Sequence, residues 1–204
     1  MPYNTFTLSR VKQDFSLIVD ETRSLFAEVS PRNPSDFLKQ ALSEYVPLAT
    51  AINTEKARSE LIIAPVMAEV RRQTGNRVSL FSGSAFDVDG EKGLTGYCDF
   101  ILSASREQLE ITAPVVTVVE AKKEDLIGGI GQCIAAMVAA QLFNERAGNQ
   151  VQTIYGGVTS GTNWRFLTIQ SQTVCIDLVE YYIDRVEKIL GILLLPMQDG
   201  SVTN

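Results

Sequence analysis

A carboxylate and an amine stand two residues apart at the end of an apolar run, in Glu120-Ala121-Lys122. The preceding residues, 115–119, are valines around one threonine, a composition typical of a strand that is covered on both faces. Side chains at i and i+2 share one face of a strand, so Glu120 and Lys122 should project together and Ala121 to the other side. Such charged groups are costly beside an apolar surface unless they are paired, solvated or bound to something.

A second carboxylate, Asp99, interrupts the apolar stretch 96–102 in the strand expected just before. If the two strands pair through the turn at 105–111, Asp99 comes beside Glu120, and two ionised carboxylates that close repel each other. A divalent cation relieves this repulsion, and Mg²⁺ is commonly held by one or two carboxylates together with waters and substrate phosphate. The structural alternative is a buried ion pair between Asp99 and Lys122, with Glu120 as a charged strand end.

Composition narrows the chemistry further. The chain has 204 residues, which at roughly 100–200 residues per domain indicates one domain, or one domain with an elaborated end. Histidine is absent, so Ser-His-Asp and Cys-His catalysis, histidine-ligated zinc and histidine-base nucleases are excluded. A net charge of −6 excludes a strongly basic nucleic-acid coat, although a local basic cleft remains compatible with it.

Cysteine usage and hydropathy favour a cytoplasmic protein. The three cysteines are far apart in apolar runs without a CxxC motif, as expected of core residues in a reducing compartment. Residues 126–144 carry no charge and approach the roughly 20 residues that span a bilayer. Their glycine, glutamine and alanine content fits a helix buried against a sheet better, so no membrane association is expected.

Helices are predicted in the first third of the chain. Leu8, Val11, Phe15 and Ile18 recur at helical spacing after a Thr7 cap, and a second apolar stripe follows over 37–45. We interpret residues 1–53 as a helical extension, a half-bundle packed on a main domain at 54–204. A third helix should run from 54 to 73, with Pro65 kinking or splitting it.

The remaining pattern predicts a mixed sheet. Strands are expected over 78–88, 94–103, 114–121, 151–158, 164–169 and 173–179, a buried helix over 126–144, and a closing helix over 183–195. A glycine-containing hairpin loop, 159–163, joins two of the strands. The order of elements is that of an α/β domain, a mixed β-sheet flanked by helices.

The ordered set of Asp99, then Glu120-Ala121-Lys122, then a helix bearing Gln132 resembles the PD-(D/E)XK nuclease superfamily, which has the restriction-endonuclease-like fold. A softer likeness to the nuclease domain of type I restriction motor subunits lies in 155–161 and 164–166. The resemblance covers about residues 54–170. Cys98 stands where the family has the proline that precedes the strand acid.

The resemblance implies a role for each residue of the set. Asp99 and Glu120 would hold Mg²⁺, which Mn²⁺ can replace, and Ala121 would lend its backbone carbonyl. Glu60 matches a helix acid that often adds a metal ligand. Lys122 would orient or activate the attacking water, and Gln132 would face the site.

We therefore expect a magnesium-dependent phosphodiester hydrolase acting on nucleic acid, DNA in preference to RNA. The alternative is a catalytically silent protein on the same scaffold that binds a partner protein or serves as an assembly subunit; the acidic charge favours it. A homodimer is also left open. The glycines at 128, 129 and 131 invite a dinucleotide-binding interpretation, but Ile134 stands where that motif needs a small residue.

Overall fold

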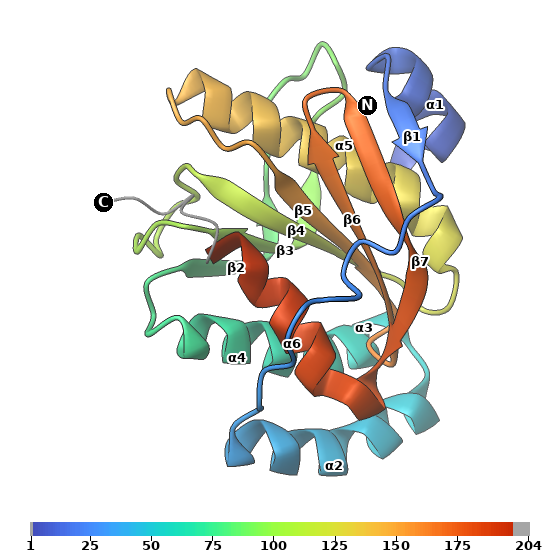
Figure 1. Ribbon diagram of the computed structural model, residues 1–204, viewed down its shortest axis with the longest axis vertical. Helices are drawn as coiled ribbons and strands as arrows, with labels where there is room; N and C mark the ends of the chain where they lie inside the picture. The colour runs from blue at the N-terminus through green and yellow to red at the C-terminus, as the bar shows by residue number, and fades with distance from the viewer. Residues whose placement is uncertain (1, 198–204) are drawn as a thin grey trace.

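The computed structural model describes residues 2–197 (Figure 1). Its strands are β1 (Ile18–Asp20), β2 (Ser79–Ala85), β3 (Tyr97–Ser103), β4 (Val115–Ala121), β5 (Ile154–Thr159), β6 (Asn163–Gln170) and β7 (Thr173–Tyr182). Its α-helices are α1 (Leu8–Asp14), α2 (Asp36–Ile52), α3 (Glu55–Arg58), α4 (Ala64–Gln73), α5 (Leu126–Arg146) and α6 (Val186–Leu194). Short helical turns are η1 (Tyr3–Thr5), η2 (Ser59–Ile63), η3 (Ile183–Arg185) and η4 (Leu195–Met197).

All seven strands form one mixed sheet in the order β1-β7-β6-β5-β4-β3-β2. Two neighbouring pairs are parallel, β4 with β5 and β1 with β7, and the other neighbours are antiparallel. The parallel step from β4 to β5 requires a crossover, which α5 provides. The prediction of an α/β domain with a mixed sheet flanked by helices is confirmed.

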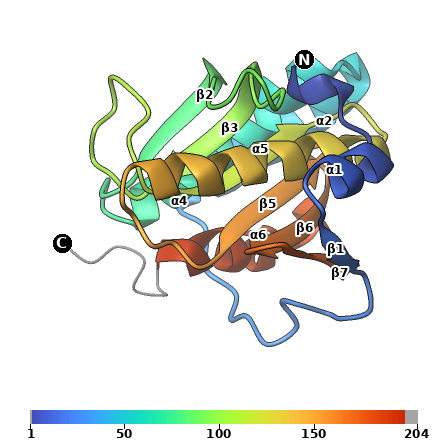
Figure 2. The ribbon, with the colours of Figure 1, turned by 90° about the horizontal axis from the view of Figure 1, so that it is seen from above.

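Helices cover both faces of this sheet (Figures 1 and 2). Side chains of α1 and α5 share one apolar core with one sheet face, and those of α2, α4 and α6 share a second core with the other face. Every residue of β4 is buried, as the valine-rich run predicted. Strand β4 therefore lies inside the molecule, and its fixed backbone positions the side chains at its end.

The N-terminal segment differs from the predicted half-bundle. Helix α1 ends at Asp14, because Ser16 adopts a left-handed φ of 52°, and Ile18 lies in β1 rather than in the helix. This short strand pairs in parallel with the start of β7, which offers an otherwise open sheet edge. Helix α2 is confirmed but packs on the opposite sheet face from α1. The segment before residue 54 thus contributes both a strand and covering helices.

Pro65 changes the predicted third helix without breaking it. The π-helical turn η2 separates α3 from α4, and the N–H of Ala64 bonds to the carbonyl of Ser59. A proline lacks the N–H that would bond four residues back and its ring crowds that carbonyl. The wider turn just before Pro65 accommodates both effects, and the chain remains helical through Gln73.

Helix α5 lies directly against the sheet and the N-terminal segment. A methyl group at Gly131 would come 2.4 Å from the backbone carbon of Thr7, and one at Gly156 of β5 would come 2.4 Å from Met137 of α5. Within residues 2–197, α5 is also the helix long and apolar enough to cross a bilayer, but 61% of that apolar window is buried inside the protein. Its hydrophobicity is accounted for by the core.

Replacing Gly131 with alanine should destabilise the fold. Alanine would favour an isolated helix by about 1 kcal/mol over glycine, but the new methyl would press on backbone atoms of Thr7 and Leu8 that cannot rotate away. Such overpacking costs roughly 1–3 kcal/mol. Urea unfolding should show a lower midpoint for Gly131→Ala. Gly90→Ala is the matched control, since a methyl there meets nothing within 4 Å; equal midpoints for both variants would contradict the close packing.

Candidate functional site

Asp99 and Glu120 lie next to each other at the end of the central strands. The antiparallel register of β3 and β4 sets Phe100 opposite Val119, so the next residue on each strand is Asp99 and Glu120. Oδ2 of Asp99 accepts a hydrogen bond from the backbone N–H of Ala121 at 2.8 Å. The two strands thereby place one carboxyl beside the other at the point where β4 ends.

Lys122, directly after β4, and Gln132, on α5, complete this cluster. Nζ of Lys122 lies 2.6 Å from Oε1 of Glu120 and donates a second hydrogen bond to Oε1 of Gln132 at 3.1 Å. The backbone N–H of Lys122 bonds to the carbonyl of Thr159 and so continues the pairing with β5. We call Asp99, Glu120, Lys122 and Gln132 the carboxylate–lysine cluster.

The environment of Glu120 opposes its ionisation. Its side chain is only 5% exposed. Burial, and then the neighbouring charge of Asp99, raise the pKa of Glu120 to about 8, although the Lys122 ammonium acts in the opposite direction. A carboxyl with such a pKa holds a proton at neutral pH unless a further cation stabilises the ionised form.

Lys122 remains an ammonium despite its partial burial. Burial acts to lower the pKa of Lys122, but the hydrogen bond of Glu120 and, when that carboxyl is ionised, its charge outweigh it, with further contributions from Glu55 and Asp99, and the net shift is upward. Lys122 is therefore a hydrogen-bond donor over the physiological range and is unsuited to act as a proton acceptor there.

The two acids of the helical segment 55–63 occupy different surroundings. Glu60 pairs with Lys56 at 3.4 Å, and its side chain is 62% exposed. Glu55, at the start of α3, is the one whose charge acts on Lys122. Residues five apart on a helix point roughly 140° from each other, so both cannot face one site. The sequence pattern singled out Glu60 and missed Glu55, although Glu55 directly follows the Thr54 cap and so stands at the helix end.

The cluster offers oxygen ligands rather than a preformed metal cage. In the described part of the chain, no group of three or more aspartate, glutamate, cysteine or histidine side chains is placed to hold a metal ion. Asp99 and Glu120, with the backbone carbonyl of Ala121 directly after Glu120, make a set of hard ligands to which waters must be added. Mg²⁺ is bound in this way by one or two carboxylates, and the residues present fit it.

Glycine at the start of α5 allows the helix to approach Lys122. A methyl at Gly129 would lie 2.7 Å from Val158 and 3.0 Å from Cγ of Lys122. The side chain of Asp125 caps the helix by accepting from the N–H of Gly128 at 2.8 Å. The glycines that invited a dinucleotide-binding interpretation thus have a packing role: they bring Gln132 within reach of Lys122.

Comparisons of the chain with protein-family models, curated proteins and solved structures found no match. The geometry of the carboxylate–lysine cluster therefore has to support any functional conclusion by itself.

The raised pKa of Glu120 predicts a specific pH dependence of stability. A carboxyl whose folded pKa of about 8 exceeds its ordinary value of 4.5 stabilises the fold fully at low pH, and this contribution is lost as pH rises from 4.5 to 8. In EDTA, Glu120→Gln should gain stability relative to wild type across this window, by up to about 1.4 kcal/mol per pH unit. Chemical unfolding at several pH values measures the difference.

The control is Glu60→Gln, whose exposed carboxylate should leave the pH profile of the wild-type protein almost unchanged. A constant difference in stability between Glu120→Gln and wild type from pH 4.5 to 8 would contradict the raised pKa.

Proposed function

We propose that this protein is a magnesium-dependent phosphodiester hydrolase acting on nucleic acid through the carboxylate–lysine cluster. The observation that carries the proposal is the adjacency of Asp99 and Glu120, with Lys122 hydrogen-bonded to Gln132 beside them. Two neighbouring ionised carboxylates repel each other, so a divalent cation would stabilise their ionised forms. An ammonium next to them can stabilise charge that develops on a phosphate.

The arrangement of elements supports the same proposal. A strand acid on β3, the triplet at the end of β4 and a glutamine on the following helix occur in the order that characterises the PD-(D/E)XK superfamily. Helix α5 leads into the parallel strand β5 and a hairpin with β6, where the softer likeness to type I restriction nuclease domains lies. We infer that the mixed sheet is of the restriction-endonuclease-like kind.

Each residue of the cluster has a distinct part in the proposed mechanism. Asp99, Glu120 and the Ala121 carbonyl would hold Mg²⁺ or Mn²⁺, with Glu55 or Glu60 as an outer acid. When bound, the ion would polarise the scissile phosphate and acidify a water. Lys122, positioned by Gln132, would donate a hydrogen bond to the attacking water or to the charge that develops on a phosphate oxygen.

The proposed substrate is DNA rather than RNA, and the proposed location is the cytoplasm. With a net charge of −6, the chain offers few cations for phosphate neutralisation. Two exposed lysines adjoin residues of interest in the chain: Lys56 follows Glu55, and Lys123 follows Lys122. Lys123 would contact a substrate phosphate next to the triplet, whereas Lys56 is held by Glu60 at 3.4 Å.

One observation favours a second candidate, a catalytically silent protein on the same scaffold that serves as a binding or assembly subunit. The ammonium of Lys122 already lies 2.6 Å from Glu120 and supplies a counter-charge that a metal would otherwise provide. In that case the cluster is a structural ion pair. The two candidates differ in whether the protein takes up a metal.

Removing the amine should strongly lower the rate of cleavage. In the presence of Mn²⁺ or Mg²⁺, Lys122→Ala is expected to lower the rate on single- and double-stranded DNA by about 10²–10⁴-fold, the range for a positioned catalytic group. Lys39→Ala on α2 is the charge-matched control, since that lysine lies on the exposed side of a helix and pairs with Asp36. Cleavage of labelled oligonucleotides measures the rates.

The same assay measures cleavage by the wild-type protein on a broad panel of DNA and RNA substrates. No metal-dependent cleavage of any of them, together with no uptake of Mn²⁺ in calorimetry, would contradict the hydrolase and support the silent subunit.

Metal uptake should release a proton from Glu120. Because its pKa is raised to about 8, the side chain must deprotonate before it can ligate a metal below that pH. Calorimetry with Mn²⁺ in buffers of different ionisation enthalpy should show nearly one proton released at pH 6.5 and almost none at pH 9. Apparent affinity should rise about tenfold per pH unit up to pH 8. Glu120→Gln should lose the proton release; its persistence would assign the proton to another group.

A further inference from the structure

An exposed aromatic residue lies beside the carboxylate–lysine cluster. Tyr97 begins β3 two residues before Asp99, and side chains at i and i+2 share one face of a strand. Two strand residues span about 6.6 Å, so the Tyr97 ring starts within a nucleotide's reach of the site. Tyr97 is 72% exposed. Within residues 2–197, its side chain makes no hydrogen bond and no contact with another aromatic ring.

Neither neighbouring strand covers the Tyr97 ring. On β2, the register places Ala85 opposite Tyr97 and sets Gly83 across from Asp99. A methyl at Gly83 would meet nothing within 4 Å, so this side of β3 carries only small residues and is open. On the other side, the pairing of β3 with β4 ends where Phe100 faces Val119. The surface from Tyr97 to the oxygens of Asp99 is therefore free to receive a ligand.

The surroundings of Tyr97 favour an uncharged, planar ligand. Asp87, whose carboxylate accepts a hydrogen bond from the N–H of Gly96 at 2.8 Å, is exposed beside it. A phosphate would be repelled by this carboxylate, whereas a nucleobase carries no charge. Within β2 and β3, Tyr97 is also the only large apolar side chain that is exposed. A protein partner would need a broader apolar surface, whereas one ring suits one base.

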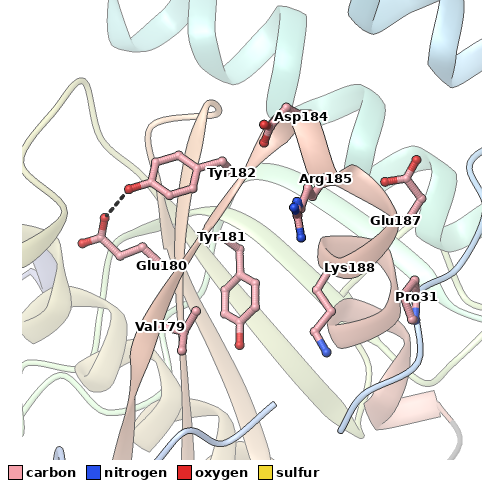
Figure 3. A pocket seen from close by; sticks show the side chains of 9 residues that line it. All are labelled: Pro31, Val179, Glu180, Tyr181, Tyr182, Asp184, Arg185, Glu187 and Lys188. Atoms are coloured by element: carbon pink, nitrogen blue, oxygen red, sulfur yellow. Dashed lines mark hydrogen bonds between the residues drawn. The ribbon is translucent and has the colours of Figure 1, made fainter. Parts of the chain in front are cut away.

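The cavity at the end of β7 is less suited to a nucleic acid chain (Figure 3). It has a volume of about 790 Å³ and lies between residues 179–182 and the segment 184–188. It shares no residue with the carboxylate–lysine cluster. Three carboxylates and two cations line it, namely Glu180, Asp184, Glu187, Arg185 and Lys188. The excess of negative charge would oppose the approach of a phosphate backbone.

We propose that the substrate is a single-stranded nucleic acid and that the Tyr97 ring stacks on the base next to the reacting phosphate. In a duplex each base is paired and stacked between its neighbours, so its face is closed to a protein ring. Stacking also supplies affinity that does not depend on dense positive charge, which a chain of net charge −6 lacks. This inference rests on the proposed hydrolase, because that function places the phosphate at Asp99 and Glu120.

The probe is a fluorescein-labelled single-stranded DNA 12-mer, whose binding to the intact protein is measured by anisotropy in Ca²⁺, a hard cation that takes oxygen ligands. Tyr97→Ala should weaken binding about 5–100-fold, the range for loss of one base–ring stack, and Tyr97→Phe should bind as wild type does. Annealing the 12-mer to its complement should weaken binding to wild type at least about tenfold and remove the effect of Tyr97→Ala.

Phe37→Ala is the matched control. Phe37 is 77% exposed and lies in the first turn of α2, at the opposite end of that helix from Asn53, which contacts Glu124 near the cluster. This variant also removes an exposed ring, but it should bind the single-stranded 12-mer as wild type does.

Tyr97→Trp gives a direct signature of stacking. Trp164, the single tryptophan of the chain, is fully buried, so a change in emission on DNA binding reports on position 97. The single-stranded 12-mer should quench this emission, because a base lies on the indole. A 12-mer of abasic nucleotides, which keeps the phosphates and lacks the bases, should leave the emission unchanged.

Four results would overturn the inference: no binding of the single-stranded 12-mer, equal binding to wild type and Tyr97→Ala, tighter binding of the duplex, or equal quenching by the abasic 12-mer. The outcome for the hydrolase is separate. Cleavage in Mn²⁺ that is lost in Lys122→Ala, but is equal on single strand and duplex and unchanged in Tyr97→Ala, would support the hydrolase and overturn the inference. Binding that depends on Tyr97 without any cleavage in Mn²⁺ would support the single-strand site and contradict the hydrolase.

Discussion

The burial of Glu120 beside Asp99 is the constraint around which the rest of the site is arranged. A carboxyl inside a sheet that is covered on both faces can ionise only if cations or donors compensate for the lost water. Asp99 gives one oxygen to the N–H of Ala121, and Lys122 approaches Glu120 within 2.6 Å. The pKa of Glu120 nevertheless stays near 8, so this compensation is incomplete. A fold that needed only stability would be served as well by an apolar residue at this position.

Close packing by α5 connects that constraint to the rest of the chain. Gly129 lets the helix lie against Lys122 and Val158, and Gly131 lets the backbone before α1 lie against the helix. The same helix then supplies Gln132 to Lys122. The N-terminal segment is thus part of the support of the cluster: α1 holds α5 from outside, while β1 extends the sheet at its far edge.

Elements with a strong local signal could be predicted from the sequence, and those that depend on distant partners could not. The valines of β4, the uncharged α5 and the stripe of α2 have their own periodicity and composition, and the structure has each of them. Strand β1 is three residues long and exists because the edge of β7 is available. The prediction that the first helix runs through Ile18 was wrong. Phe15 and Ile18 fit a helical stripe by their spacing, and no neighbouring residue indicates that Ser16 has a left-handed backbone.

The same distinction explains what could be said of the site. Asp99, Glu120 and Lys122 were identifiable because charged residues in apolar strands are conspicuous and strand alternation fixes their relative direction. The sequence did not show which acid of the segment 55–63 faces the cluster. The orientation of this segment depends on the π-helical turn before Pro65 and on how the segment meets the sheet. No periodicity in the sequence reveals an inserted residue in a helical turn, so Glu55 and Glu60 could be separated only in three dimensions.

The position of Lys122 bears on both proposed functions. An ammonium 2.6 Å from a buried carboxyl is stabilising only to the extent that the carboxyl is ionised, and a pKa near 8 means that at neutral pH the pair is mostly a lysine beside a protonated acid. An ion pair selected for structure would be expected to lower the pKa of its acid, as Arg72, Gln73 and Ser35 do against the burial of Glu69, whose pKa falls to about 2. The two glutamates differ in their partners: Glu69 accepts from Arg72, Gln73 and Ser35, whereas Glu120 has Lys122 beside a second carboxylate, and this difference accounts for the opposite directions of their pKa shifts.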